Sequence, residues 1–328
     1  MLVLSRSETE SLLDPDELRH VVSRAMVDVS EGRASIPARI AAEIGGVDGL
    51  LLAMPGYLPS SDGLAAKLVT LFPENAGTAF PTHQAVVLVF DAATGAPAAL
   101  VDGTSITAAR TAAGSALATD LLALPDARVL AILGTGVQAR SHARAVTRVR
   151  TFDEIRICGR NPEHARQLAD EVGSEVPCEV VTVDSFDVAC SGANVICATT
   201  HSPDPVVSRS TLDPGVHVNS VGYNAAGREI DSRTVADALL VVESRAAVLA
   251  PPPSGSTDIR VPIEEGLIAE AHIHAELGEL VAGVRAARTS RDQLTLYKSV
   301  GIAAQDVAAA ALVLRAAQER GVGVHVDL

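Results

Sequence analysis

Hydrophobic and polar positions alternate along this chain with two different periods. Residues 8–31 place apolar side chains on one face at the spacing of a helix. The runs that follow, separated by turn sequences rich in Gly, Pro and Asp, predict strands at residues 40–54, 64–72, 85–90 and 98–101. A long Ala-rich helix is predicted over Thr104–Leu124. The first third of the chain therefore predicts an α+β unit whose strands are mostly antiparallel.

From Ala127 onward, short apolar runs alternate with helical segments. The runs predict strands at residues 129–133, 155–158, 180–183, 195–198, 216–221 and 239–242. Alternating strands and helices are typical of a parallel, doubly wound sheet. The segment Ile302–Arg315 is again an Ala-rich helix. We therefore predict an α/β protein with a parallel sheet in its second part.

The composition of the chain limits the kinds of partner that we expect it to bind. The 328 residues are enough for two domains, and 48% hydrophobic with 20% charged residues is ordinary for a globular protein. The net charge of −14 repels phosphate backbones, so we expect no nucleic-acid partner. The apolar runs are too short or interrupted to span a bilayer. The first 30 residues contain Glu, Asp and Arg and no secretory signal pattern, so we expect a cytoplasmic protein without a membrane partner.

The four cysteines give no sign of a metal centre. They have no C-x-x-C spacing, and Cys158 and Cys197 lie in apolar strand-like runs. Buried free thiols are the expected state of these two residues. We predict no metal.

A glycine-rich turn follows the first strand of the parallel sheet. Val129–Leu133 runs into Gly134-Thr135-Gly136-Val137-Gln138-Ala139, which fits a dinucleotide-binding turn with Ala as its third small residue. The first glycine allows the tight turn, the second lets the backbone approach a pyrophosphate, and the helix start holds the anion. The alternative is a glycine-rich turn without a ligand.

The end of the second strand indicates the type of dinucleotide. Sheets that bind NAD usually carry Asp or Glu there for the ribose hydroxyl, but this strand ends in Cys158-Gly159-Arg160-Asn161. The guanidinium of Arg160 matches the 2′-phosphate of NADP. We therefore expect NADP(H) to be preferred and NAD(H) to be possible. The alternative is that Arg160 is simply an exposed loop residue.

Seven blocks of sequence together resemble the ornithine cyclodeaminase/μ-crystallin family, in order, from about Leu2 to the C-terminus. Their ordered pattern is more specific than a glycine-rich turn alone. The blocks are Lys67-Leu-Val, Phe80-Pro-Thr-His83, Phe90-Asp-x3-Gly95, Asp102-Gly-x3-Thr107-x2-Arg110-Thr-Ala-Ala, Gly134-Thr-Gly-x-Gln-Ala139-x2-His142, Asn219-Ser-Val-Gly222 and Lys298-Ser-Val-Gly301-x-Ala-x2-Asp306.

The resemblance implies a fold and an assembly. It implies a Rossmann domain, residues 121–300, inserted in an α+β domain that binds substrate and forms a homodimer, residues 1–120 plus 301–328. Family members include cyclodeaminases, alanine dehydrogenases, reductases of cyclic imino acids and a lens crystallin.

The resemblance also implies site residues. Arg39, Lys67 and Arg110 match the substrate-carboxylate ligands, Thr82 matches a substrate-contacting threonine, and Lys67 is a candidate proton donor. The positions that correspond to cofactor contacts are Thr111, Gly134, Thr135, Gly136, Val137, Gln138, Arg160, Asn161, Thr199, Thr200, Val221, Gly222, Lys298 and Ser299.

One position departs from the cyclodeaminase pattern. Members that cyclise ornithine have a Val-Gly-Gly-Asp-like segment, and Val221-Gly222-Tyr223-Asn224 places Asn224 at the aspartate's position. An amide accepts no proton at neutral pH and holds no ammonium group by charge. We therefore interpret Asn224 as a catalytic-site hydrogen-bonding residue. The alternative is that it caps the turn, with Glu229 or Asp231 in the charged role.

These observations predict an NAD(P)H-dependent oxidoreductase that acts on the C–N bond of a small α-imino or α-amino acid. A cyclic substrate such as 1-pyrroline-2-carboxylate is one expectation, and amino-acid dehydrogenation is the reverse reaction. The alternatives are a cyclodeaminase that releases ammonia with a bound NAD, and a non-catalytic NADP-binding protein of the crystallin kind.

Overall fold

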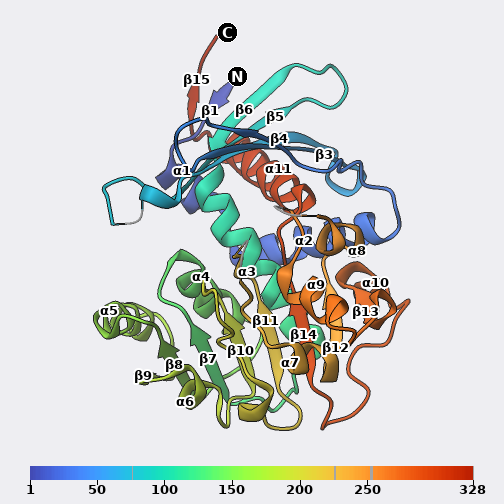
Figure 1. Ribbon diagram of the computed structural model, residues 1–328. Coiled ribbons are helices and arrows are strands. Elements are labelled where there is room, and N and C mark those ends of the chain that lie inside the picture. Colours follow the sequence, from blue (N-terminus) through green and yellow to red (C-terminus); the bar gives the residue numbers. More distant parts are fainter. Residues whose placement is uncertain (76, 225–226, 252–253, 328) are drawn as a thin grey trace. The chain divides into compact units, whose positions relative to one another are not determined.

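The computed structural model describes residues 1–75, 77–224, 227–251 and 254–327. The chain forms two compact units, each described here by itself (Figure 1). The first unit contains Met1–Arg110 and Ile302–Leu328, and the second contains Thr111–Gly301. Helix α3 (Gly103–Leu122) begins in the first unit and ends in the second.

The first unit is built on a mixed seven-stranded sheet with the order β15-β1-β6-β5-β4-β3-β2. Its only parallel pair among the described residues is β1 with β6, so the predicted, mostly antiparallel arrangement is confirmed. The strands are β1 (Leu2–Val3), β2 (Ile40–Glu43), β3 (Leu50–Leu58), β4 (Gly63–Leu71), β5 (His83–Phe90), β6 (Pro97–Asp102) and β15 (Val324–His325).

Helix α11 (Ala303–Arg320) packs against β3, β4 and helix α2. Its Ala303 joins a small apolar cluster with Leu52, Met54 and Val69. Successive residues of a strand point to opposite faces, so the odd-numbered positions of β4, including Lys67 and Val69, face α11. The other helices of this unit are α1 (Arg6–Leu12), α2 (Pro15–Ser30) and the short 3₁₀ helices η1 (Pro59–Ser61) and η2 (Pro73–Asn75).

Two predicted elements of this unit are wrong because a turn divides each of them. The helix expected over residues 8–31 is two helices, since Asp14 accepts hydrogen bonds from the N–H groups of Asp16 and Glu17 and caps a new helix that begins at Pro15. Proline is favoured at the first position of a helix, where its missing N–H costs nothing. The strand expected over residues 40–54 is divided into β2 and β3 by residues 44–49.

The second unit is an eight-stranded, fully parallel sheet with the order β13-β12-β14-β11-β10-β7-β8-β9, which confirms the predicted doubly wound α/β class. Strands β13 and β14 were not predicted. The strands are β7 (Val129–Leu133), β8 (Glu154–Cys158), β9 (Glu179–Thr182), β10 (Val195–Ala198), β11 (His217–Ser220), β12 (Leu239–Val242), β13 (Ile273–Glu276) and β14 (Thr295–Lys298).

Both faces of this sheet are covered, as a parallel sheet requires. Leu130 and Ile132 of β7 lie in one apolar cluster, whereas Ala131 and Leu133 lie in another. The helices of the unit are α4 (Val137–Val146), α5 (Pro162–Gly173), α6 (Phe186–Cys190), α7 (Ser232–Asp237), α8 (Arg245–Leu249), α9 (Thr257–Glu264), α10 (Leu277–Val281), η3 (Arg209–Thr211) and η4 (Glu270–His272) (Figure 1).

Three further features concern the cysteines, metal binding and membrane-spanning helices. Cys158 and Cys197 are buried free thiols, as predicted. Within the described ranges, no group of three or more His, Cys, Asp or Glu side chains could hold a metal ion. No helix among the described residues has the length and apolar character that crossing a membrane would require.

Candidate active site

Three charged side chains meet in the interior of the first unit. Lys67 of β4 lies on the sheet face covered by α11, and its Nζ is 2.8 Å from Oδ2 of Asp306 on that helix. The Nε of Arg110, on α3, is 3.1 Å from Oδ1 of the same carboxylate. Each of the three residues is at most 4% exposed. Two of the predicted carboxylate ligands, Lys67 and Arg110, are therefore brought together around one aspartate.

Neighbouring groups hold this cluster in place. The Nη1 of Arg110 donates to Oε1 of the buried Gln305 at 2.6 Å, and the Nζ of Lys67 lies 3.5 Å from Oγ1 of Thr107. Burial lowers the pKa of Lys67 to about 8; Asp306 raises this pKa, whereas Arg110 and Arg39 lower it further. The half-buried Arg39 thus lies close enough to act on the Lys67 charge.

The charges of this cluster do not balance. Lys67 and Arg110 carry two positive charges against one negative charge on Asp306. Burial of Asp306 would raise its pKa, but Arg110 and Lys67 outweigh that effect and lower it, so the carboxylate stays ionised. A buried surplus of positive charge is costly unless an anion compensates it. The cluster is therefore suited to bind a further carboxylate.

Thr82 is placed differently. It lies in the loop before β5, where its hydroxyl is 3.2 Å from Nδ1 of His83 and its carbonyl oxygen accepts a hydrogen bond from the N–H of Phe72. Its hydroxyl is therefore engaged outside the Lys67–Arg110–Asp306 cluster.

The candidate cofactor residues lie almost entirely along one edge of the second unit's sheet. Because the sheet is parallel, the carboxyl ends of its strands share an edge, which is where open α/β sheets bind ligands. Thr111 is the exception, as a buried residue of α3. The residues that follow β7, β8, β10 and β11, or that end β14, are Gly134, Thr135, Gly136, Val137, Gln138, Arg160, Asn161, Thr199, Thr200, Val221, Gly222, Lys298 and Ser299.

The turn after β7 has the form of a phosphate cradle. Gly134 has φ +117°, and a Cβ atom there would lie 2.7 Å from Oγ1 of Thr199. Gly136 caps α4 without a side-chain hydrogen bond, and a Cβ atom there would meet nothing within 4 Å. Val137, the first residue of α4, is 54% exposed for an apolar side chain. Open space above a helix start that no side chain caps fits the pyrophosphate of a dinucleotide.

Two residues after β8 have different roles. Asn161 caps helix α5, because its Oδ1 accepts a hydrogen bond from the N–H of Glu163 at 2.9 Å. Arg160 is exposed, and no ion pair involves it in the described part of the chain. Asn161 is therefore engaged by the fold, whereas the side chain of Arg160 lies at the surface.

Glu229 and Asp258 both organise this edge, although few sequence signals single them out. From the sequence, Glu229 was considered only as an alternative to Asn224 for the charged role. A carboxylate directly before the apolar Ile230 was a signal that could have identified it. The Oε1 of Glu229 accepts from the N–H and hydroxyl of Thr200, and its Oε2 accepts from Ser220 Oγ and the N–H of Gly222, both at 2.9 Å. Asp258 pairs with Lys298 at 2.7 Å. No local pattern marked Asp258.

Asn224 links two loops of the same edge. Its Nδ2 donates to the carbonyl oxygen of His201 at 3.0 Å, and the backbone oxygen of Tyr223 is 2.7 Å from Nδ1 of His201. Asp231 caps helix α7 by accepting from the N–H of Thr234 at 2.7 Å. The loop after β11 is therefore tied to the loop after β10, and Asp231 serves the fold.

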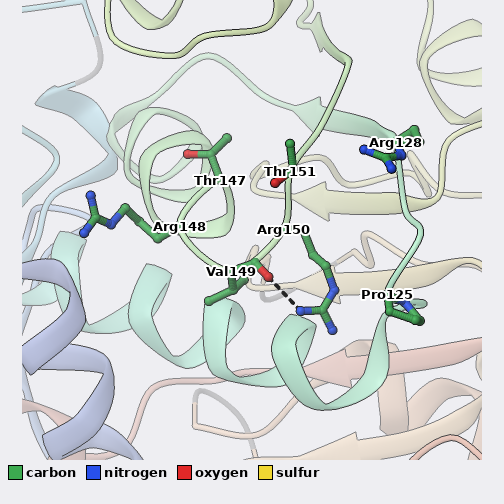
Figure 2. Close-up of a pocket in the computed structure, with 7 residues that line it drawn as sticks. All are labelled: Pro125, Arg128, Thr147, Arg148, Val149, Arg150 and Thr151. Carbon is green, nitrogen blue, oxygen red and sulfur yellow. Dashed lines mark hydrogen bonds between the residues drawn. The ribbon is translucent and has the colours of Figure 1, made fainter.

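A pocket at the opposite edge of the sheet is not part of this site (Figure 2). It lies next to the amino ends of β7 and β8, and Arg150 points into it. The guanidinium of Arg150 donates to the carbonyl oxygens of Val149, Asp120, Ala123 and Leu124, so it mainly caps the end of α3. The lining residues are Pro125, Arg128, Thr147, Arg148, Val149, Arg150 and Thr151.

Comparison with known proteins identifies relatives over the full chain. Residues 1–321 match the ornithine cyclodeaminase/mu-crystallin family. A Delta(1)-pyrroline-2-carboxylate reductase of Bacillus cereus is 35% identical over 100% of both chains. The Thermococcus litoralis Delta(1)-pyrroline-2-carboxylate reductase, solved with NADH and L-proline, has a TM-score of 0.95 and 41% identity and covers 99% of this chain and 100% of its own. An archaeal alanine dehydrogenase dimer with bound NAD has a TM-score of 0.90 and 28% identity, covering 100% and 99%.

Two glycine substitutions should separate binding from folding. Gly136→Ala places a methyl group in open space, so the free energy of unfolding should change by less than about 1 kcal/mol while dinucleotide affinity falls at least about tenfold. Gly222→Ala would overlap the Thr200 carbonyl oxygen and the Glu229 carboxylate, so it should destabilise the fold by about 1–3 kcal/mol. Denaturant unfolding and cofactor titration measure the two effects. Unchanged affinity in Gly136→Ala would contradict the cradle.

Proposed function

Because the chain belongs to the ornithine cyclodeaminase/mu-crystallin family, we propose that it is an NAD(P)H-dependent reductase of a small cyclic α-imino acid such as 1-pyrroline-2-carboxylate. The observation that carries this proposal is the buried cluster of Lys67 and Arg110 around the single carboxylate of Asp306. The Bacillus cereus and Thermococcus litoralis relatives bear the name of this activity.

The first unit supplies the groups that bind and protonate the substrate. The surplus positive charge of Lys67 and Arg110, with Arg39 nearby, attracts the α-carboxylate. A carboxylate held by a guanidinium is fixed in direction as well as position, which orients the neighbouring C=N bond. The ammonium group of Lys67 has a proton to give to the imine nitrogen, because the pKa of about 8 keeps it protonated at neutral pH and still acidic enough to donate.

The second unit supplies the dinucleotide site. When bound, a reduced dinucleotide would supply a hydride with its electron pair to the imine carbon, so that the cofactor would be oxidised as the imino acid is reduced. Lys67 would supply the proton that the nitrogen gains. The residues that would hold the cofactor are those of the glycine turn after β7 and of the loops after β10, β11 and β14.

The loop after β11 favours a cyclic imine over a diamino acid. Asn224 carries no charge for a distal ammonium group, and its Nδ2 donates to the carbonyl oxygen of His201. A substrate without that ammonium group needs no carboxylate at this position.

A substrate panel tests the proposed function. Five- and six-membered cyclic α-imino acids should oxidise NADPH or NADH, measured by absorbance, whereas ornithine should release no ammonia. Rapid ammonia release from ornithine without reduction of any imine would replace the proposal with a cyclodeaminase. Cofactor binding without turnover of any substrate would indicate a non-catalytic protein.

Arg110→Ala should lower kcat/KM by the equivalent of about 3–5 kcal/mol, the range for leaving a buried charge without its partner. Arg315→Ala is the matched control, because Arg315 is an exposed arginine of the same unit on α11. That control should change kcat/KM by less than about 0.5 kcal/mol. Equal losses in the two variants would remove Arg110 from the substrate site.

The rate of imine reduction should depend on the protonation of Lys67. Since the pKa of Lys67 is about 8, kcat/KM should be level below this pH and fall about tenfold per pH unit above it. Lys67→Arg keeps its charge at every accessible pH, so its residual activity should lack this decline. A decline of the same shape in the variant would assign the proton to another group.

The second unit should prefer NADP(H). Arg160, which is exposed and without an ion pair in the described ranges, would bind the 2′-phosphate, and the strand end carries no carboxylate to bind a ribose hydroxyl. The structures of relatives contain NADH or NAD. The preference of this protein is therefore tested by comparing its own affinities for NADPH and NADH. Titration should give the wild type tighter NADPH than NADH binding, and Arg160→Glu should reverse that order. Equal wild-type affinities would contradict the preference.

The first unit should form a homodimer through the sheet face opposite α11. Ile40, Ala53, Leu68 and Val86 stand in one row across β2, β3, β4 and β5. Ile40 is 69%, Leu68 39% and Val86 40% exposed, which is unusual for a row of apolar side chains. The alanine dehydrogenase relative is a dimer.

Leu68→Glu should therefore convert the dimer to monomers in sedimentation at micromolar concentration, because it places a charge in the middle of an apolar interface. Val188→Glu, at an exposed apolar position of α6 in the second unit, is the control and should leave the assembly unchanged. A monomeric wild type would contradict the proposed dimer.

A further inference from the structure

Three buried charged side chains lie beside the carboxyl ends of the central strands of the second unit. They are Glu229, Asp258 and Lys298, each at most 3% exposed. Lys298 ends β14 and donates to Ser220 Oγ of β11 at 3.0 Å and to the carbonyl oxygen of Gly222 at 2.8 Å. The group is called the Glu229 cluster below.

The hydrogen-bond partners of Glu229 favour its charged form, because all four of them can donate to it. Its Oε1 faces the N–H of Thr200 and its Oε2 faces the N–H of Gly222, and a backbone N–H can only donate. The hydroxyls of Thr200 and Ser220 complete four contacts that a carboxylate accepts without any rearrangement. Burial raises the pKa of Glu229, Lys298 lowers it and Asp258 raises it.

Asp258 neutralises the one cation of the cluster. Its Oδ2 pairs with Nζ of Lys298 at 2.7 Å, and its Oδ1 accepts from the N–H groups of Glu229 and Ile230 at 2.7 and 2.9 Å. The two carboxylates and one ammonium group leave a net charge of −1.

The position of the surplus charge matters for a dinucleotide. In a doubly wound sheet the two halves of the ligand bind on either side of the point where strand order reverses. Here that point lies between β7 and β10, and β7 carries the phosphate cradle together with β8 and β9 on one side. The Glu229 cluster belongs to the other half, with β10, β11 and β14. A dinucleotide whose pyrophosphate lies on the glycine turn after β7 would place its nicotinamide nucleotide in that half.

We propose that the net negative charge of the Glu229 cluster stabilises the positive charge that the nicotinamide ring gains when it gives up its hydride. The proposal rests on the dinucleotide binding of the proposed function. A fixed charge in a dry site acts most strongly where charge develops during the reaction. Glu229 and Asp258 are thus positioning residues for the loops and, through their charge, bias the bound cofactor towards its oxidised form.

The proposal is tested by measuring the affinity of the protein for each redox form of the cofactor, which needs no substrate. Glu229→Gln keeps the size of the side chain and removes one negative charge, and Asp258→Asn does the same at the second carboxylate. Each variant should raise the ratio of the Kd of the oxidised form to the Kd of the reduced form about tenfold, the effect of one charge at close range. Calorimetry and NAD(P)H fluorescence give the two constants.

Ser220→Ala is the control, because it deletes a hydrogen bond to Glu229 without changing any charge. It should weaken both forms of the cofactor alike and leave the ratio unchanged. A ratio that stays constant in Glu229→Gln, with both affinities lowered together, would make the cluster purely structural and overturn the proposal. Should one of the two charge variants fail to fold, the other decides.

Failure of the proposed function would give a different experimental result from failure of the charge proposal. If wild-type protein bound neither form of either dinucleotide, the proposed function would fall, and the charge proposal with it. If the wild type binds both forms and reduces imines while neither charge variant alters the ratio, only the charge proposal falls.

Discussion

The pairing of buried charge is the constraint on which both units of this protein depend. Among the described residues of the first unit, Asp306 is the carboxylate that compensates Lys67 and Arg110, within an interior where an unpaired ion costs several kcal/mol. Loss of that carboxylate would leave two cations without a partner, so α11 is held to β4 and α3 by this cluster as well as by apolar contacts. The same cluster leaves one positive charge over, which suits it to an anionic ligand.

The second unit also contains paired buried charges, but its surplus charge is negative. Glu229 and Asp258 outnumber Lys298, and backbone N–H groups supply the remaining donors. Gly222 has no space for a Cβ atom beside Glu229. The backbone can therefore lie this close to the carboxylate only because the residue is glycine. A positive surplus suits an anionic substrate, whereas a negative surplus suits a ring that becomes cationic.

Sequence patterns predicted the parts of this molecule that depend on neighbouring residues. The strand, glycine turn and helix around Gly134 and Gly136 are of this kind, because periodicity and backbone freedom are local properties. The family resemblance identified Lys67 and Arg110, and each of them also interrupts an apolar run. Gln305 and Asp258 were missed, since their partners Arg110 and Lys298 are distant along the chain. The division of the first predicted helix at Asp14 was missed although its cap and proline are local, because the apolar periodicity continues across it.

The loop after β11 shows how satisfied charges limit chemistry. A diamino acid would require an anion for its distal ammonium group, and the carboxylates nearest along the chain are Glu229 and Asp231. Both oxygens of Glu229 already accept two hydrogen bonds each, and Asp231 accepts from Thr234 and Arg209 N–H groups. Turning either towards a ligand would leave buried donors unpaired, at about 1–3 kcal/mol for each donor. Because Asn224 is uncharged, an ammonium group could pair with Glu229 or Asp231 of this loop only if their present hydrogen bonds were broken.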